Sequence, residues 1–498
     1  MGRFRVLSAG AAFWLLACSG DRVLGDYPPS TCDLADPPVE FSNEPLSIAT
    51  FWADSHEQDA LEQLRRRIDS RRYLVSTEQM RTRVEVQRHI NDAFESQQLP
   101  DVFQVNGGSD VLRWVQSRPV DATDVCALDR LRDTYDWETA YFPAALAPLS
   151  CRGGLYGLPV GIHHLNVLFF NRPLFAALAT RAHADGVELT DPSELKTAHE
   201  LVSELARVAE LQATTPSGKP LVPLAIGSES EWPLTVIAFE NVLLSLGHDA
   251  YESLWMGGLA DASAERRAEL SDALTEMLAV LRDLRSFSDV ATEVSWQDAV
   301  RQVGSGEALM TITGDWGFAQ LDADVVGDVE TVTFPGTSGT FVYTPDSFAV
   351  PRELGKNGFP ARSFLHDIVQ DKAALIDFAN AKHAIPPRRD LMPSEVDALN
   401  RESLRATYRR FSDCNGSDSG CKLLLAVSGL APPPGTDACF DEMDSLLTFA
   451  VSGNPPADTG STPRLCSQPF PTTGAAAEAR LIQLLLSVAE RRFAADCR

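Results

Sequence analysis

Two adjacent histidines, His163 and His164, stand out as residues whose side chains could do chemistry near neutral pH. A pair of imidazoles could hold a metal ion or supply a base. They lie within the apolar stretch LPVGIHHLNVLFFN, which predicts β-strand, and adjacent strand side chains point to opposite faces. We therefore expect that the two rings do not bind one ion.

Nine cysteines form the second group of reactive residues. Setting Cys18 aside leaves an even number, which in an exported protein indicates disulfides. The chain contains no Cys-x-x-Cys pair and no histidine at zinc-like spacing beside these cysteines, so we expect neither a metal nor another cofactor. The favoured local pairs are Cys414 with Cys421 and Cys126 with Cys151, although the connectivity stays open. The disulfide candidates are Cys126, Cys151, Cys414, Cys421, Cys439 and Cys466.

The first eighteen residues, MGRFRVLSAGAAFWLLAC, are typical of an export signal. Arg3 and Arg5 precede an apolar run, which ends in LLAC and resembles the bacterial lipobox. This predicts a lipoprotein signal peptide over 1–18, with lipid on Cys18 as the attachment to the membrane. The alternatives are an ordinary signal peptide cut nearby and a short anchor that stays. We expect an extracytoplasmic lipoprotein, in the periplasm or at the cell surface.

The charge balance limits the partners of the protein. There are 69 acidic and 43 basic residues, giving a formal net charge of −26. Such a surface repels phosphate backbones and anionic lipid headgroups, so we expect no nucleic-acid partner. The chain lacks G-x-S-x-G, H-E-x-x-H and a phosphate-binding glycine loop, which disfavours the common hydrolases and nucleotide-dependent enzymes.

Strands alternate with helices along most of the chain. LSIATFW and LPDVFQV read as strands, and the apolar residues of HEQDALEQLRRRIDSR and ELKTAHELVSELARVAELQ fall at helical spacing. This alternation predicts an α/β fold with a largely parallel sheet, and 498 residues suffice for two lobes. The polar, proline-containing segment 19–45 reads as a spacer. Segment 412–471, rich in Gly, Pro, Ser and Cys, reads as a disulfide-linked surface excursion.

Several blocks of sequence resemble a known family. PDVFQV, PLAIGSESEWPLTVIAFENVLLSLG, SWQDAVRQVGSGEALMTITGDWG and PGTSGTFVYTPDSFAVP follow one another in the order found in family 1 extracellular solute-binding proteins of bacterial ABC sugar importers, particularly the glucose type. The resemblance implies a two-lobed periplasmic-binding-protein fold with a ligand cleft between the lobes. Lobe 1 would comprise 46–155 with about 305–345, and lobe 2 would comprise 156–304 with about 346–498. The stretch that contains the two histidines would pass from one lobe to the other.

The resemblance also implies ligand-binding positions. They comprise two aromatic residues after the first strand with a polar neighbour, two amides around the FQV strand, a histidine in the lobe crossing, two tryptophan platforms, an acid and a lysine. These are Phe51, Trp52, Glu57, Gln104, Asn106, His163, Trp296, Trp316, Asp346 and Lys382. Tryptophan faces cover the C–H faces of a sugar, while carboxylates and amides bond to its hydroxyls.

The leading function is therefore a monomeric receptor that binds a neutral, glucose-like monosaccharide or a small oligosaccharide and presents it to ABC permease subunits. Such a receptor needs no catalytic residues. One alternative is an exported glycosidase-like enzyme using two carboxylates, since acidic residues are abundant. Another is a relative of the binding proteins that acts as a sensor or surface module.

Overall fold

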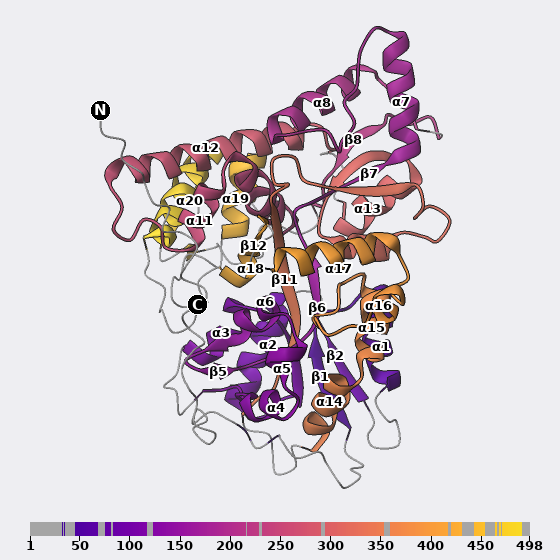
Figure 1. Ribbon diagram of the computed structural model, residues 1–498. Coiled ribbons are helices and arrows are strands. Elements are labelled where there is room, and N and C mark those ends of the chain that lie inside the picture. Colours follow the sequence, from indigo (N-terminus) through magenta and orange to yellow (C-terminus); the bar gives the residue numbers. More distant parts are fainter. Residues whose placement is uncertain are drawn as a thin grey trace, which may run out of the picture.

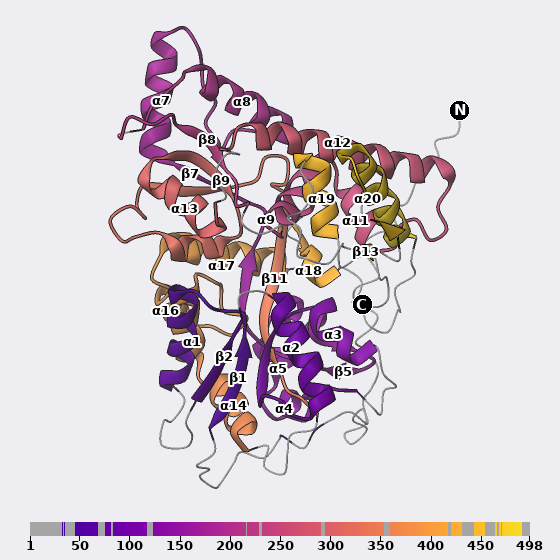
Figure 2. The same ribbon diagram turned by 180° about the vertical axis from the view of Figure 1, so that it is seen from behind.

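The protein is described here by a computed structural model. It describes residues 32, 34, 45–67, 75–80, 83–116, 123–215, 217–228, 232–289, 294–352, 359–416, 420–430, 443–453, 464–465, 468–469 and 471–490. Within this part, the chain forms two lobes, each built around its own β-sheet (Figures 1 and 2). We call them the six-stranded lobe and the four-stranded lobe.

The six-stranded lobe has the strand order β12-β11-β3-β1-β2, with β6 paired to β11. Its strands are β1 (Leu46–Thr50), β2 (Val75–Gln79), β3 (Val102–Asn106), β6 (Leu158–His164), β11 (Thr340–Ala349) and β12 (Lys422–Leu425). β1 runs parallel to β2 and β3, whereas β11 runs antiparallel to β3 and β6. The predicted parallel sheet is thus joined by antiparallel strands that come from distant parts of the chain.

Helices cover both faces of this sheet. On one side lie α1 (Ser55–Arg67), α14 (Phe359–Gln370) and α15 (Lys372–Lys382); on the other lie α2 (Arg83–Ser96), α3 (Ser109–Gln116), α4 (Asp129–Thr134) and α5 (Trp137–Ala140) (Figures 1 and 2). In α1, the predicted helical spacing is confirmed, because Ala60, Leu61 and Leu64 are all buried.

The four-stranded lobe has the strand order β10-β7-β9-β8. Its strands are β7 (Val167–Asn171), β8 (Val222–Ala225), β9 (Ala308–Ile312) and β10 (Val329–Thr333), and its flanking helices are α7 (Arg172–Ala184), α8 (Ala198–Glu210) and α13 (Trp296–Ser305). Helix α8 begins where Thr197 accepts a hydrogen bond from the backbone N–H of Glu200, and it buries Leu201, Leu205 and Val208 as the sequence predicted.

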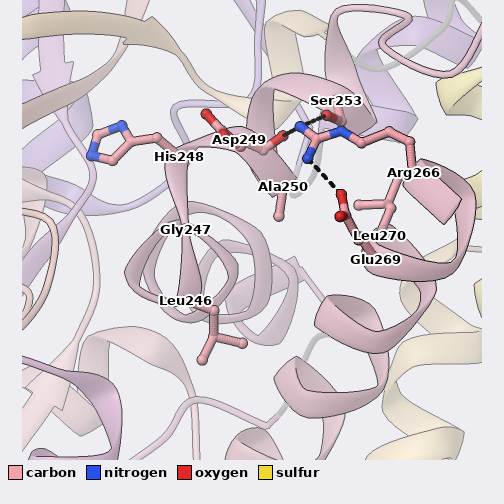
Figure 3. A pocket seen from close by; sticks show the side chains of 9 residues that line it. All are labelled: Leu246, Gly247, His248, Asp249, Ala250, Ser253, Arg266, Glu269 and Leu270. Carbon is pink, nitrogen blue, oxygen red and sulfur yellow. Dashed lines mark hydrogen bonds and ion pairs between the residues drawn. The ribbon is translucent and has the colours of Figure 1, made fainter. Parts of the chain in front are cut away.

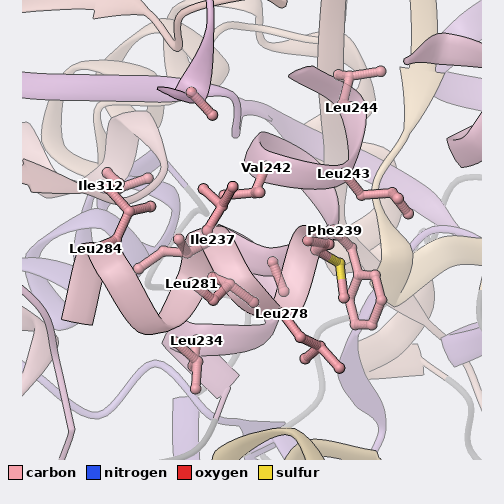
Figure 4. Close-up of a cluster of buried hydrophobic side chains, with 14 of the residues drawn as sticks. Leu234, Ile237, Phe239, Val242, Leu243, Leu244, Leu278, Leu281, Leu284 and Ile312 are labelled. Carbon is pink, nitrogen blue, oxygen red and sulfur yellow. The ribbon is translucent and has the colours of Figure 1, made fainter. Parts of the chain in front are cut away.

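A helical layer completes this lobe. The long α12 (Ala264–Ser286) runs beside α11 (His248–Trp255), α19 (Met443–Ser452) and α20 (Gly474–Ala489) (Figure 1). Leu278 and Leu281 of α12 pack with Ile237 and Phe239 of the π-helical segment η3 (Val236–Leu243), as Figure 4 shows. The prediction that 412–471 is a surface excursion is wrong for α19, because Leu447 and its neighbours lie in this core. The turn-forming residues on both sides of α19 masked its apolar spacing in the sequence.

The lobe crossing is where the sequence placed it. β6 lies in the six-stranded sheet and β7 in the four-stranded sheet, so LPVGIHHLNVLFFN spans the junction. The predicted lobe boundaries differ from the structure at three places. β6, expected in lobe 2, pairs in the six-stranded sheet; β9 and β10, expected in lobe 1, pair in the four-stranded sheet. After 346, α14 and α15 pack in the same core as β1. Strand pairing between distant segments decides these memberships, and apolar patterns do not record it.

Two disulfides are described. Cys414 pairs with Cys421, as predicted. The expected Cys126–Cys151 pair is wrong, because Cys126 is bonded to Cys32. Cys151 is itself disulfide-bonded. A short separation in sequence does not ensure that two cysteines face each other in space.

The Cys32–Cys126 bond also changes the interpretation of the segment before β1. Leu34 is buried in the core of the six-stranded lobe, and its carbonyl accepts a hydrogen bond from His366. At these two positions the predicted spacer is therefore part of the lobe. Cys18, Cys439 and Cys466 lie outside the described residues. Among the helices that are described, none is long and apolar enough to span a membrane.

Candidate ligand-binding site

A buried charged cluster joins the two lobes. His163, near the end of β6, bonds through Nδ1 to Asp315 at 2.7 Å and through Nε2 to Asp346 at 3.1 Å. Asp346 lies on β11 in the same sheet as His163, whereas Asp315 begins the 3₁₀ helix η4 (Asp315–Gln320), which follows β9 of the four-stranded lobe. All three side chains are almost fully buried. His163 therefore bridges the two lobes.

The two carboxylates favour the cationic form of His163. Burial alone would lower the pKa of this imidazole, but the charges and hydrogen bonds of Asp315 and Asp346 outweigh burial and raise the pKa to about 9. His164 behaves in the opposite way: its ring stacks on Phe341 at 4.0 Å, and burial and the nearby Arg410 hold its pKa well below the ordinary value. The expectation that the two histidines face different surroundings is confirmed.

Three tryptophans cluster beside this bridge. The Trp316 ring lies 6.5 Å from that of Trp296 and 6.0 Å from that of Trp232, between ring centroids, and it meets the His163 ring edge-on at 5.3 Å. All three indoles are partly exposed. Trp296 begins helix α13, whereas Trp316 and Trp232 lie in two short helical turns of the four-stranded lobe, η4 and α9 (Trp232–Thr235). Such a cluster can present aromatic surface to a ligand.

Two glycines allow this arrangement. A Cβ at Gly314 would meet the Trp316 ring at 2.1 Å, so only glycine lets the indole fold back over the end of β9. A Cβ at Gly227 would lie 2.8 Å from the Cα of Trp296, so glycine also permits the close approach of α13 to the end of β8. The motif GDWG thus has a steric as well as a chemical role.

A second buried ion pair lies in the six-stranded lobe. Lys382, at the end of α15, pairs with Glu57 in the first turn of α1, and its ammonium lies 5.4 Å from the centroid of the Trp52 ring. Burial would lower the pKa of Lys382, but Glu57 and Asp346 raise it above its ordinary value. Trp52 is fully buried and packs against Phe348 and Phe378, so its ring covers the ion pair from within the core.

The remaining predicted residues lie in or directly after the neighbouring strands β1 and β3. Asn106 is directly opposite Asp346 in the β3–β11 pairing. Gln104 accepts hydrogen bonds from the hydroxyl of Thr50 and, at 3.1 Å, from the backbone N–H of Phe51, so its carbonyl oxygen is used within the lobe. Phe51 is partly buried. The predicted residues thus form two groups, one with His163 and the tryptophans and one around Lys382.

Sequence reasoning did not select Asp315 or Trp232. Both lie inside blocks that resemble the family, GDWG and ESEWPL, but neither spacing nor residue type singled them out. Gln320, a few residues after Asp315, adds another contact between the lobes by donating to Asp54 at 3.0 Å. The sequence offers one signal for Asp315, which is its place directly before Trp316. Adjacent positions in a short turn can serve the same site.

Hollows away from the lobe junction are the alternative sites. One of about 440 Å³ is lined by Leu246, Gly247, His248, Asp249, Ala250, Ser253, Arg266, Glu269 and Leu270. Arg266 is part of this lining, and Figure 3 shows that its guanidinium already donates hydrogen bonds to Ser253 and Glu269. Each of these bonds is 2.9 Å long. Its lining comes from neighbouring helices of one lobe and includes none of the predicted residues. We therefore place the candidate site at the lobe junction. Among the described residues, no group of three or more His, Cys, Asp or Glu could hold a metal ion.

Comparison with known proteins assigns the family. Residues 72–398 match the model of the bacterial extracellular solute-binding proteins. The chain is a bacterial extracellular solute-binding protein. This confirms the family that the sequence blocks indicated.

Relatives of this solute-binding protein include an uncharacterised ABC transporter extracellular-binding protein of Pyrococcus horikoshii, 23% identical over 358 residues, which are 71% of each chain. A probable sugar-binding periplasmic protein of Rhizobium meliloti is 25% identical over 303 residues, which are 60% of this chain and 65% of the relative. The xylose/arabinose-binding protein of Haloferax volcanii is 26% identical over 263 residues, 51% of this chain and 50% of the relative.

Solved structures show the same fold. A chitin oligosaccharide binding protein superposes with a TM-score of 0.66 at 13% identity, covering 89% of this chain and 99% of that one. The GacH receptor of Streptomyces glaucescens superposes with a TM-score of 0.65 at 14% identity, covering 91% of this chain and all of that one. The two-lobed fold expected for the solute-binding protein is thereby confirmed.

Proposed function

We propose that this solute-binding protein captures a sugar between its lobes and delivers it to the permease subunits of an ABC importer. The single observation that carries the proposal is the inter-lobe cluster, in which aromatic rings of the four-stranded lobe lie beside buried charges of the six-stranded lobe. The family supports it, as do the relatives, which include a probable sugar-binding protein and a xylose/arabinose-binding protein.

The proposed ligand is a neutral monosaccharide of the glucose type or a small oligosaccharide. Trp296 and Trp316, with Trp232, would cover its C–H faces, and Asp346 with Asn106 would accept or donate hydrogen bonds to its hydroxyls. His163 cannot offer a proton freely, because both of its nitrogens are engaged. Lys382 with Glu57 would act beneath this surface by fixing the end of α15 against α1.

Binding of this kind operates by closure. A ligand stabilises a closed form only through contacts that it makes better there than in the open form, so its contacts must come from both lobes. The cluster meets this requirement, because the tryptophans belong to the four-stranded lobe and Asp346 belongs to the six-stranded lobe. No covalent step is needed, and we propose that the protein has no enzymatic activity.

A monomeric lipoprotein attached through Cys18 is proposed from the sequence of residues 1–18. Labelling of the full chain with a lipid precursor in a bacterial host, next to Cys18→Ala, tests this point. We expect lipid on the wild-type chain alone. Incorporation into the variant as well would contradict the assignment of Cys18.

The glycosidase alternative is separated from the receptor by turnover. The protein is incubated with chromogenic glucosides, galactosides, xylosides and maltosides, and we expect no release of the chromophore. Release that is abolished by Asp346→Asn would favour the enzyme. Release of the same size from a mock purification without the protein would point to a contaminating activity.

A further inference from the structure

Three buried side chains from three elements form a continuous chain of contacts, Asp315–His163–Asp346. The second link lies within the six-stranded lobe, whereas the first joins that lobe to the four-stranded one. Asp315 begins η4, and the next residue is Trp316, whose ring contacts His163. Any opening that moves η4 away from β6 therefore separates Asp315 from His163 and leaves the His163–Asp346 link on its own side.

These contacts require a proton on both nitrogens of His163. A cationic imidazole donates from both nitrogens and satisfies both carboxylates, whereas a neutral imidazole donates from only one. Loss of the proton would thus leave one buried carboxylate without a donor from His163, which is costly away from water. The second oxygen of Asp315, Oδ2, already has no hydrogen-bond partner among the described residues. The Asp315–His163 contact between the lobes therefore depends on the charge of His163.

We propose that Asp315 is a positioning residue that acts through His163. On closure it completes the pairing of the imidazolium, which then holds the Asp346 carboxylate in the orientation that a sugar hydroxyl requires. The inference rests on the proposed function for its ligand and goes beyond it by naming the group that couples closure to ligand affinity. The raised pKa of His163, about 9, agrees with this role.

Other charged groups surround the same histidine. Besides Asp315 from η4 and Asp346 from β11, His383 at the end of α15 lies close enough to interact electrostatically with it. Lys382 interacts with Asp346 but is paired with Glu57. The charge of Lys382 is thus offset by Glu57. His383 is kept neutral, because burial holds the pKa of its ring well below the ordinary value. The two carboxylates remain the groups that decide the charge of His163.

The test compares the wild-type chain with Asp315→Asn and with Asp324→Asn, a matched control on the exposed loop after η4. Each is titrated with glucose, galactose, mannose, xylose and maltose by calorimetry, and the sugar that binds best is followed from mildly acidic to alkaline pH. We expect Asp315→Asn to raise the dissociation constant about tenfold at neutral pH, whereas the control stays at the wild-type value.

The pH profile separates positioning from a merely structural effect. Wild-type affinity should hold up to about pH 9 and fall above it, because His163 then loses its proton. In Asp315→Asn the fall should begin nearer the ordinary histidine range, about 6.5, since one of the two carboxylates is gone. Asp315→Glu, which keeps the charge, should restore most of the wild-type profile. An Asp315→Asn protein with wild-type affinity and a wild-type pH profile would overturn the inference.

Small-angle scattering keeps this inference separable from the proposed function. If no sugar binds to any form, the proposed function fails, but the radius of gyration still reports the link between the lobes. The inference then requires Asp315→Asn to be more extended than the wild-type protein and the control at neutral pH. If Asp315→Asn does not fold, histidine-selective NMR of the wild-type chain decides. A His163 pKa at or below the ordinary value of about 6.5 would overturn the inference.

Discussion

Asn166 donates a hydrogen bond from its side-chain amide to the carbonyl of Thr340 at 3.1 Å, which ties the segment that leaves the six-stranded lobe to the one that returns to it. The same amide nitrogen donates to the hydroxyl of Thr337 at 2.8 Å, and the amide oxygen accepts from the backbone N–H of Val342 at 2.9 Å. Asn166 is fully buried between β6 and β7. These bonds hold the β6–β7 crossing and the start of β11 together as one hinge, about which the lobes would turn.

Replacing Asn166 by Ala should therefore weaken both the fold and the hinge. It removes three hydrogen bonds and leaves their partners buried, so we expect the free energy of unfolding to fall by about 2–4 kcal/mol. Urea denaturation measures this loss. Thr337→Val removes one of the three bonds, together with the bond that the Thr337 hydroxyl donates to the carbonyl of Phe334 at 2.8 Å, and should cost less than the loss of all three. If Asn166→Ala is as stable as the wild-type protein, the hinge does not depend on this amide.

The ion pair of Lys382 and Glu57 makes a second prediction. Lys382→Met leaves the Glu57 carboxylate poorly solvated and without its cation, and we expect a loss of about 3 kcal/mol in the free energy of unfolding. The double variant, Lys382→Met with Glu57→Gln, should recover much of that loss, because no uncompensated charge remains. Urea denaturation of the two single variants and the double variant measures the coupling. Strictly additive losses would contradict the pairing.

The pKa of His163 predicts how stability depends on pH. Because the folded-state pKa is raised to about 9 from an ordinary 6.5, the protonated form is favoured by folding. This contribution is complete below about pH 6.5 and is lost as the pH rises through 9, with an upper bound of about 3 kcal/mol. Urea denaturation at a series of pH values checks it, with His163→Gln as the comparison. Equal slopes for the two proteins over this window would show that His163 does not titrate in this way.

The two described disulfides should stabilise the folded state by different amounts. Cys32–Cys126 spans 94 positions and Cys414–Cys421 spans 7. The chain-entropy relation gives about 4.7 kcal/mol for a loop of the larger size and about 2.4 kcal/mol for the smaller. Replacing both cysteines of each pair by Ala, followed by denaturation without reductant, measures the two losses. We expect the larger loss for the Cys32–Cys126 pair, and the reverse order would contradict its role in holding the segment before β1 to the lobe.

Local patterns in the sequence predicted local structure well. The spacing of Leu201, Leu205 and Val208 predicted the buried face of α8, and the alternation around His163 and His164 predicted their opposite surroundings. Both features depend on residues a few positions apart, for which the periods of helix and strand apply directly. The family blocks extended this reach to the two-lobed fold.

Relations between distant residues could not be predicted in this way. Cys126 pairs with Cys32, although Cys151 is nearer in sequence. β9 and β10 were expected in lobe 1, but they pair in the four-stranded sheet. Asp315 was missed because its importance comes from His163, 152 positions earlier, and one sequence does not show which acid meets which base. The resemblance to the family implied that Trp52 faces the ligand, but its ring is fully buried against Phe348 and Phe378.

The central claim is that a sugar binds between the lobes at the tryptophan cluster and Asp346. Its most direct test is a calorimetric and tryptophan-fluorescence titration of the chain after Cys18 with glucose, galactose, mannose, xylose and maltose, beside Trp316→Ala, Asp346→Asn and the exposed control Asp324→Asn. The expected result is saturable binding of one sugar, weakened about tenfold or more by the first two changes and unaffected by the third. Binding that neither Trp316→Ala nor Asp346→Asn weakens, or no binding to the folded wild-type chain, would contradict the claim.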